Sequence, residues 1–263
     1  ELQAIWSYVV KGLEDGKSST QEALKQAVAD LKRIPQKKPL RDAPQVLVVG
    51  EIYVRKEGLS RRWLPERLAE SGIVSYVAPM HEWMYYVDWC LEHKLSDKAV
   101  SFKTLLLNKA KHKIMVRVER DVKRIMAESG WYIPRIVEMD HVIEVGENFI
   151  SRNLTGEAIL TVGGPMAEVG TEFCGSIAIG PFGCMPNRLS ESILNLKMDR
   201  EHLMRFRKDR MTDQVTSEVP NMPFLAIESD GSPFPQLIEA RLETFVIQAL
   251  RVHNVMMKYC NEH

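Results

Sequence analysis

Cysteine is scarce in this sequence, with four residues in 263, and no two of them form a CxxC pair. Cys174 and Cys184 stand ten positions apart with a predicted strand between them, and that length of extended chain is too great for a local disulfide. The scarcity argues against a small secreted domain held by disulfides and predicts a reducing, cytoplasmic setting.

Long apolar runs and an excess of one charge are missing too. No run approaches the ~20 residues of a membrane-spanning helix, and the N-terminus lacks the basic and apolar regions of a signal peptide. The 35 lysines and arginines equal the 35 aspartates and glutamates, which gives a formal net charge of zero. We therefore expect neither nucleic acid nor a membrane surface as a partner.

Four short apolar segments are what the chain does contain. Each has consecutive apolar residues, the pattern of a strand that a parallel sheet buries on both faces. They are Gln45–Gly50, Ile73–Ala78, Ser176–Ile179 and Pro223–Glu228. Because predicted helices separate them, the sequence predicts an α/β fold with a doubly wound, mostly parallel sheet of about four strands.

Helical periodicity accounts for much of the remaining chain. Three residues, Gly163, Gly164 and Pro165, are expected to interrupt one of the predicted helices. The predicted helices cover residues 2–13, 19–34, 64–72, 157–169, 189–210 and 236–259.

The sequence predicts two parts. Residues 1–40 form N-terminal helices and a basic linker that contains proline, and residues 41–263 form the α/β lobe with a helical insertion at about 80–133. The first residue is Glu1 rather than Met, so we expect a fragment whose upstream segment is missing.

The loops that follow the four predicted strands should gather along one edge of the sheet, where α/β proteins bind ligands. The first of these loops carries neither GxGxxG nor GxxxxGK[ST], so it does not indicate nucleotide binding. Each acidic residue in these loops, taken singly, is more often a solvated charge or a cap. The candidate cofactor-binding residues are Gly50, Glu51, Gly183, Cys184, Glu228 and Asp230.

Cys184 is the most informative of these residues, because it lies between the end of a predicted strand and the start of a predicted helix. Backbone N–H groups at a helix start favour a thiolate. Three interpretations stay open: a cysteine packed in a tight turn, a metal or iron–sulfur ligand, and a nucleophile with His81 as its base.

Two helical segments have both a plain and a functional interpretation. The basic run from Lys98 to Met126 is either a solvated helix face or a surface for phosphates such as those of coenzyme A. The aromatic cluster of Trp83, Tyr85, Tyr86 and Trp89 is either helix packing or an interface to another part of the protein.

Several blocks resemble the (R)-2-hydroxyacyl-CoA dehydratase superfamily, and most of all the dehydratase-like part of acyl-CoA dehydratase activase-related proteins, also called CoA-substrate-specific enzyme activases. The resemblance covers roughly residues 40–250. The blocks are Val48–Arg55, Ala78–Trp83, Gly180–Pro186, Glu228–Gly231 and Glu239–Phe245.

This resemblance implies a Rossmann-like or flavodoxin-like lobe from anaerobic metabolism, in a system where an ATP-dependent activase drives a low-potential electron into the dehydratase. It also implies a [4Fe–4S] cluster between two lobes, with Cys184 as one ligand and the others in a missing N-terminal lobe. The ATPase motifs of the activase are absent from this sequence. We therefore expect no cluster in this chain alone.

The leading prediction is a C-terminal lobe that contributes one cysteine ligand to an inter-lobe [4Fe–4S] cluster, used in low-potential electron transfer or in dehydration of acyl-CoA. The alternative is a non-catalytic docking or regulatory module that has lost this chemistry. A two-fold homodimer is the default expectation for assembly.

Overall fold

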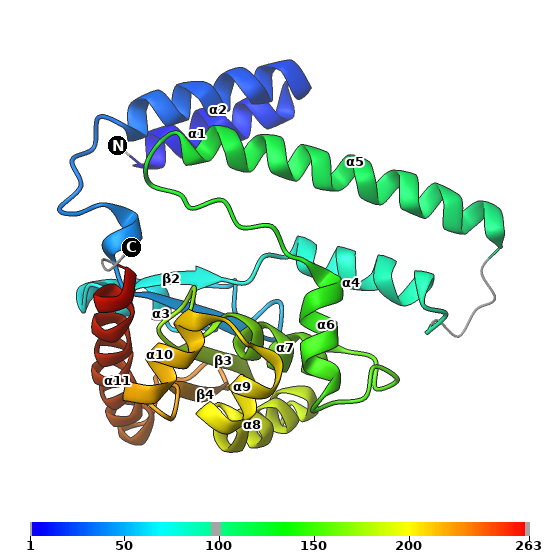
Figure 1. Cartoon of the computed structure of the whole chain (residues 1–263). Helices are drawn as coiled ribbons and strands as arrows, with labels where there is room; N and C mark the ends of the chain where they lie inside the picture. Colours follow the sequence, from blue (N-terminus) through cyan, green and yellow to red (C-terminus); the bar gives the residue numbers. More distant parts are fainter. Residues whose placement is uncertain (1, 96–100, 261–263) are drawn as a thin grey trace. The chain divides into compact units, whose positions relative to one another are not determined.

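A computed structural model describes residues 2–95 and 101–260 of the chain (Figure 1). The chain divides into two compact units. The helical unit comprises Glu1–Ala43 and Cys90–Val137, and the sheet unit comprises Pro44–Trp89 and Glu138–His263. The N-terminal helices and most of the predicted insertion thus fall in one unit, and the predicted strands fall in the other.

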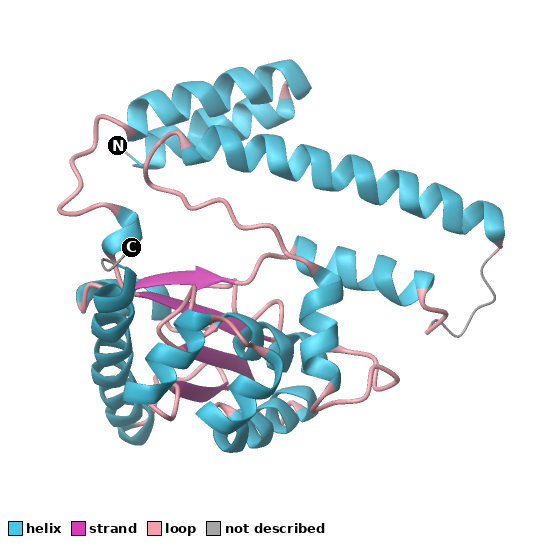
Figure 2. Ribbon diagram, viewed as in Figure 1, coloured by secondary structure: helices cyan, strands magenta, loops and turns pink. Residues whose placement is uncertain are grey.

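The sheet unit is built on four parallel strands in the order β2-β1-β3-β4 (Figure 2). The strands are β1 (Gln45–Gly50), β2 (Val74–Val77), β3 (Ser176–Pro181) and β4 (Phe224–Ser229). This arrangement confirms the predicted α/β fold with a doubly wound parallel sheet. The expectation of full burial is correct for β1, whose six residues are all buried, and wrong for β2, whose four residues are only half-buried.

Strand β3 is two residues longer than the sequence predicted. Gly180 and Pro181 were expected to end it, but they pair with Glu228 and Ser229 of β4. A proline is tolerated at this position because the N–H of the next residue, Phe182, donates to the Ser229 carbonyl of β4 at 3.1 Å, so the pairing does not need an N–H from residue 181.

Helices cover both faces of the sheet, as the side-chain alternation of β3 shows. Phe245 of α11 (Gln236–Cys260) lies against Gly175, whereas Asn187 of α8 (Met185–Lys197) lies against Gly180. Gly175 and Gly180 are an odd number of residues apart, so they face opposite sides of the sheet, and α11 and α8 lie on opposite faces. The other helices of the unit are α3 (Leu64–Glu70), α4 (His81–Glu92), α6 (Met139–Glu147), α7 (Glu157–Glu168), α9 (Arg200–Phe206) and α10 (Arg210–Glu218). The last residues of α4, from Cys90 on, belong to the helical unit.

Helix α7 corrects one expectation, because Gly163, Gly164 and Pro165 do not interrupt it. A Cβ at Gly163 would lie 2.1 Å from the carbonyl oxygen of Val142 in α6, so this glycine lets two helices pack at backbone contact. Close packing with α6 therefore stabilises a segment whose own helix propensity is poor. Helix α6 itself was not predicted.

The helical unit contains α1 (Leu2–Glu14), α2 (Lys17–Leu31) and the 26-residue helix α5 (Phe102–Ala127). A short 3-10 turn, η1 (Leu40–Asp42), ends its first segment. The predicted basic run began at Lys98, which lies outside the described residues. Ser101 caps α5 by accepting a hydrogen bond from the Thr104 N–H at 3.2 Å.

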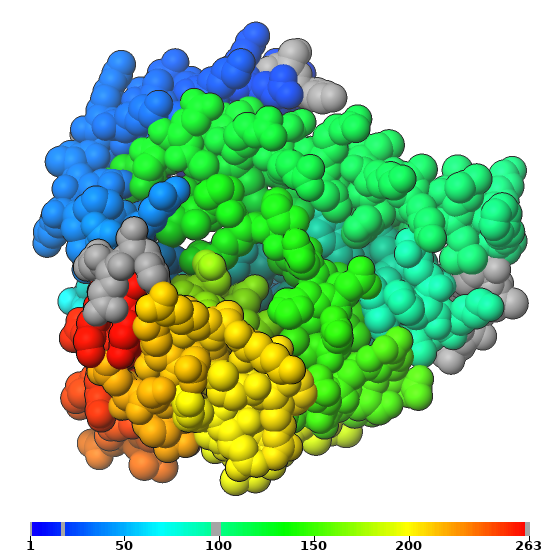
Figure 3. Space-filling model, viewed as in Figure 1, coloured from blue at the N-terminus to red at the C-terminus, as the bar shows by residue number. Residues whose placement is uncertain are grey.

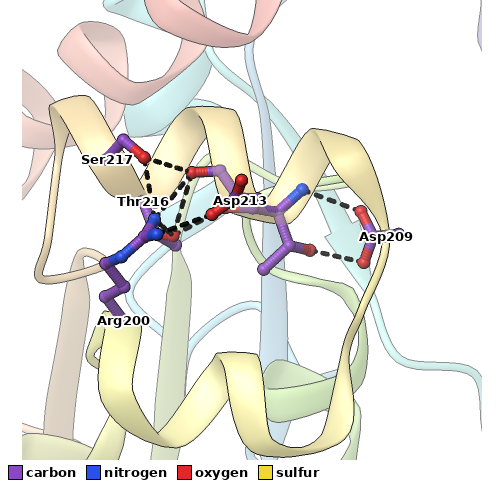
Figure 4. A network of polar contacts seen from close by, with 6 residues as sticks. Arg200, Asp209, Asp213, Thr216 and Ser217 are labelled. Atoms are coloured by element: carbon purple, nitrogen blue, oxygen red, sulfur yellow. Dashed lines mark hydrogen bonds and ion pairs between the residues drawn. The ribbon is translucent and has the colours of Figure 1, made fainter.

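A polar network joins α9 to α10 (Figure 4). The Arg200 guanidinium donates to the Asp213 carboxylate at 2.6 Å and to the Thr216 hydroxyl at 3.0 Å. Asp209 caps α10, since its carboxylate accepts from the Thr212 N–H and from the Thr212 hydroxyl, both at 2.7 Å. Each polar side chain of this α9–α10 junction thus has a partner within the fold.

Among the residues that the structure describes, none of the helices has the length and apolarity that crossing a bilayer requires.

Candidate functional site

The carboxyl edge of the sheet, where all four strands end, carries the candidate site. Strand β1 connects to β2 on one side of it, whereas β3 connects to β4 on the other side. The crossovers therefore diverge between β1 and β3, which makes the ends of these two strands the topological switch point. Helices α4, α7 and α8 also begin at this edge.

Gly50 and Glu51 form the β1 side of the switch point. Gly50 has a φ of +104°, and a Cβ there would lie 2.1 Å from the Ile179 carbonyl oxygen, so only glycine fits. The Glu51 N–H donates to that same oxygen at 2.9 Å. The Glu51 carboxylate accepts from the Val54 N–H at 2.7 Å, which stabilises the turn after β1.

Gly183, Cys184 and Glu228 lie together on the β3 side. Gly183 has a φ of +74° and donates its N–H to the Glu228 carboxylate at 3.2 Å. The second oxygen of that carboxylate accepts from the Arg188 guanidinium at 2.7 Å. Glu228 therefore holds the loop that presents Cys184, and Cys184 itself is the half-exposed N-cap of α8.

Asp230 is the candidate residue that lies farthest along the last loop. It is exposed and accepts from the Ser232 N–H at 2.8 Å, in a turn where Gly231 has a φ of +83°. Hydrogen bonds from Ser232 lower the pKa of Asp230. These contacts are those of a turn residue.

The other cysteines lie elsewhere. Cys174 is buried at the opposite end of β3, where its thiol donates to the Gln45 carbonyl at 3.0 Å, and burial raises its pKa to about 12. A thiol with that pKa is a poor ligand at neutral pH. Cys90 lies near the end of α4 and Cys260 at the end of α11. Cys184 is thus the cysteine that the fold places at the carboxyl edge.

A buried charge cluster adjoins the β1 side of the edge, and none of its residues was among the candidate residues chosen from the sequence. Arg55, which is almost fully buried, donates to the Gly50 carbonyl and to the Glu82 carboxylate, both at 3.0 Å. Burial raises the pKa of Glu82, although Arg55 opposes this shift. Glu157, the first residue of α7, accepts from the Ile52 N–H and from the Trp83 indole, both at 3.0 Å.

Lys56 extends this cluster. Its ammonium group donates to the Val77 carbonyl at 3.2 Å. Burial, together with the neighbouring positive charges of Arg55 and Arg61, lowers the pKa of Lys56 to about 8. Glu82 follows the second predicted strand, so the sequence did predict that it reaches this edge, although the structure places it in the first turn of α4. The long-range partners of Arg55, Lys56 and Glu157 leave no local pattern.

Asn187, in the first turn of α8, is the second residue that the sequence did not reveal. Its side chain is only 2 % exposed, and neither its amide oxygen nor its amide nitrogen has a hydrogen-bond partner among the described residues. Buried amides are normally paired with protein atoms or with an ordered water, so Asn187 has room for a polar partner that the described residues do not supply. Asn187 lies one turn after Cys184 and against Gly180, directly beside the switch point.

Exposed apolar side chains surround this edge. They come from the loops after β1, β2 and β3 and from the helix starts that follow, which are the positions where a solvated loop would carry polar residues. The large exposed ones are Tyr53, Leu59, Trp63, Met80, Met84, Phe182 and Met185. Apolar surface of this kind marks contact sites.

The ligand set at the edge does not by itself fit a whole metal site. Across residues 2–95 and 101–260, no three histidine, cysteine, aspartate or glutamate side chains are arranged to hold a metal ion. A [4Fe–4S] cluster takes about four thiolates, and the cysteine that lies at this edge is Cys184. His81, the predicted base, is the first residue of α4, and no hydrogen bond joins the Cys184 thiol to a histidine among the described residues.

A separate hollow of about 360 Å³ lies at the amino edge of the sheet, at the far end of α8. Leu194, Met198, Pro223 and Phe224 are among the residues that line it. Its charged lining residues are Asp199 and Arg251, and the Asp199 carboxylate pairs with His202 at 2.8 Å between oxygen and Nδ1.

Comparison with known proteins identified no relative: no family model, no curated protein and no solved structure matches this chain.

Proposed function

We propose that this chain is an α/β lobe of the 2-hydroxyacyl-CoA dehydratase type, in which Cys184 supplies one thiolate ligand to a [4Fe–4S] cluster shared with a second lobe. The observation that carries the proposal is the position of Cys184, half-exposed beside the β1/β3 switch point at the N-cap of α8. A helix start stabilises a thiolate, and switch points bind ligands.

Two further observations support a site that is completed from outside the chain. The amide of Asn187, which has no partner among the described residues, lies one turn from Cys184. A second lobe would supply a hydrogen-bond partner for this amide. The exposed apolar side chains around the edge, such as Phe182 and Met185, are suited to contact with another lobe.

The proposal includes the setting that the sequence resemblance implies. The second lobe would belong to the same protein, an ATP-dependent activase would deliver electrons, and the substrate would be an acyl-CoA in the cytoplasm of an anaerobe. The cluster would supply low-potential electron transfer. In this chain, Glu228 and Gly183 would fix the loop that carries the ligand cysteine.

The test is anaerobic reconstitution of the full-length parent protein with ferrous iron and sulfide. We expect Cys184→Ala to lose most of the bound iron and acid-labile sulfide while the far-UV circular dichroism is unchanged. Cys260→Ala, which alters an exposed cysteine at the end of α11, should keep the iron content of the parent.

Unchanged iron content in Cys184→Ala would show that Cys184 is not a cluster ligand. A parent protein that takes up no cluster at all would instead favour the alternative function, a non-catalytic docking module built on the same edge.

A further inference from the structure

Helix α5 of the helical unit exposes an apolar stripe. Leu107, Ile114 and Val118 are 62 %, 63 % and 50 % exposed, and they stand seven and four positions apart, so they lie on one side of the helix. Helix α5 has 26 residues and is therefore about 39 Å long. Three large apolar side chains in one row are more than scattered surface residues.

A basic stripe runs along the same helix, roughly a third of a turn around its axis from the apolar stripe. Its members stand three or four positions apart and are all exposed, and no acidic side chain of the described chain forms an ion pair with any of them. They are Lys109, Lys113, Arg117, Arg120 and Arg124. Asp121 is the one exposed acid on this helix, so the stripe keeps most of its positive charge.

Between α2 and α5 the apolar stripe opens into a groove. These helices lie side by side, as the blue and green segments of Figures 1 and 3 show. The groove has a volume of about 310 Å³. Leu24 of α2 lines it together with Ile114, Val118 and Val122 of α5, which form apolar walls. Arg117 and Asp121 of α5 are its charged lining residues, so the excess of positive charge comes from the basic stripe outside the groove.

The charge of the whole chain is divided between the two units. The helical unit holds 19 lysines and arginines against 11 aspartates and glutamates, a formal charge of +8. The sheet unit holds 16 against 24, a formal charge of −8. The net charge of zero therefore conceals a strongly basic unit, and α5 carries much of its excess.

We propose that the α2–α5 groove and its basic stripe bind an acidic amphipathic helix of a partner protein. The apolar row of such a helix would lie against Leu107, Ile114 and Val118, and its carboxylates would face the basic stripe. A helix in a groove is a common mode of recognition, and charge complementarity gives it orientation and a fast association rate. A concave groove fits a helix better than it fits a flat lipid surface. This inference is independent of the function proposed for Cys184.

The test measures binding of a fluorescent synthetic peptide to the full chain by anisotropy. The peptide has leucines that repeat at helical spacing and glutamates that flank them, and its control has the same composition in scrambled order. We expect the ordered peptide to bind at least about tenfold more tightly than the scrambled one, and to weaken about tenfold between about 50 mM and about 500 mM NaCl.

Two double variants separate the parts of the surface. Ile114→Asp with Val118→Asp removes the apolar stripe, and Lys113→Glu with Arg117→Glu reverses the basic one; each should weaken binding about tenfold or more. All four positions are exposed, so the fold should be unchanged by circular dichroism. The matched control is Ile247→Asp with Arg251→Glu on α11, where Ile247 is 69 % exposed; its binding should equal that of the parent chain.

Equal binding of the ordered and scrambled peptides, or no loss in either α5 variant, would overturn the proposal. Vesicles that contain phosphatidylserine form a separate arm. If the chain binds them through α5 and ignores the peptide, the surface recognises anionic lipid and the proposed protein partner is wrong.

Discussion

The α9–α10 junction and the carboxyl edge both bury polar side chains near a helix start, but the threonines at the junction have hydrogen-bond partners in the described chain, whereas the asparagine at the edge has none. At the junction, Thr212 and Thr216 are fully buried, and their hydroxyls bind Asp209, the Thr212 carbonyl and Arg200. At the edge, Asn187 is almost as deeply buried and its amide binds nothing in the described chain. A stable fold usually pairs such a group with its own atoms or with an ordered water, so the Asn187 amide is available to a polar partner from outside the described chain.

The two regions also differ in how their ion pairs are solvated. The Arg200–Asp213 pair at the junction is about half-exposed, whereas Arg55–Glu82 at the edge is almost completely buried. Water screens the first pair and not the second, so the same kind of contact has different consequences in the two places.

The largest expected effect sharpens this second difference. Glu82→Leu should lower the free energy of unfolding by about 3–5 kcal/mol, because Arg55 would stay buried without its anion. Asp213→Leu, the matched change at the junction, should cost about 1 kcal/mol or less. Urea denaturation measures both values. Equal losses in the two variants would mean that burial does not distinguish the two pairs.

An intermediate effect is the change in stability when a buried polar side chain is made apolar, which should differ in sign between the two regions. Thr216→Val removes a paired hydroxyl and should destabilise the chain by about 1 kcal/mol. Asn187→Leu removes an unpaired amide of similar shape and should leave the stability unchanged or raise it slightly. Thermal unfolding measures the stability of the two variants against that of the unmodified chain. A clear loss of stability in Asn187→Leu would show that the amide is paired after all, and the contrast between the regions would disappear.

A pH dependence should belong to the edge alone. Lys56 has a pKa of about 8 in the folded chain, against its usual 10.5. Between these pH values the unfolded chain binds more protons than the folded one, so the free energy of unfolding should rise as the pH rises. Lys56→Met should remove this rise, whereas Lys11→Met on the exposed face of α1 should not. Parallel curves for the parent chain and Lys56→Met would contradict the burial of this ammonium group.

Most of the fold could be predicted because its signals are local. Strands β1, β3 and β4 begin within a residue of their predicted starts, since runs such as Gln45–Gly50 are apolar at nearly every position. The errors occur where tertiary contacts override local propensity. Helix α7 continues through Gly163 and Pro165 because α6 packs against it at backbone distance.

The candidate site was predictable only in part, for the same reason. A strand end followed by a helix start was enough to place Cys184 at the carboxyl edge. The contact of Glu157 with Ile52 joins residues that are far apart in the chain, and the isolation of Asn187 depends on every neighbour around it. Such properties belong to the assembled structure and have no sequence pattern of their own.

The division of charge between the two units has a consequence for handling the protein. A chain with a formal net charge of zero is usually expected to respond little to ionic strength. Here the basic unit of one molecule can attract the acidic unit of another, so we expect clustering in dilute buffer and dissolution of the clusters as salt is added. Light scattering across a salt series would reveal this salting-in, and buffers chosen from the net charge alone would be the wrong ones for purification.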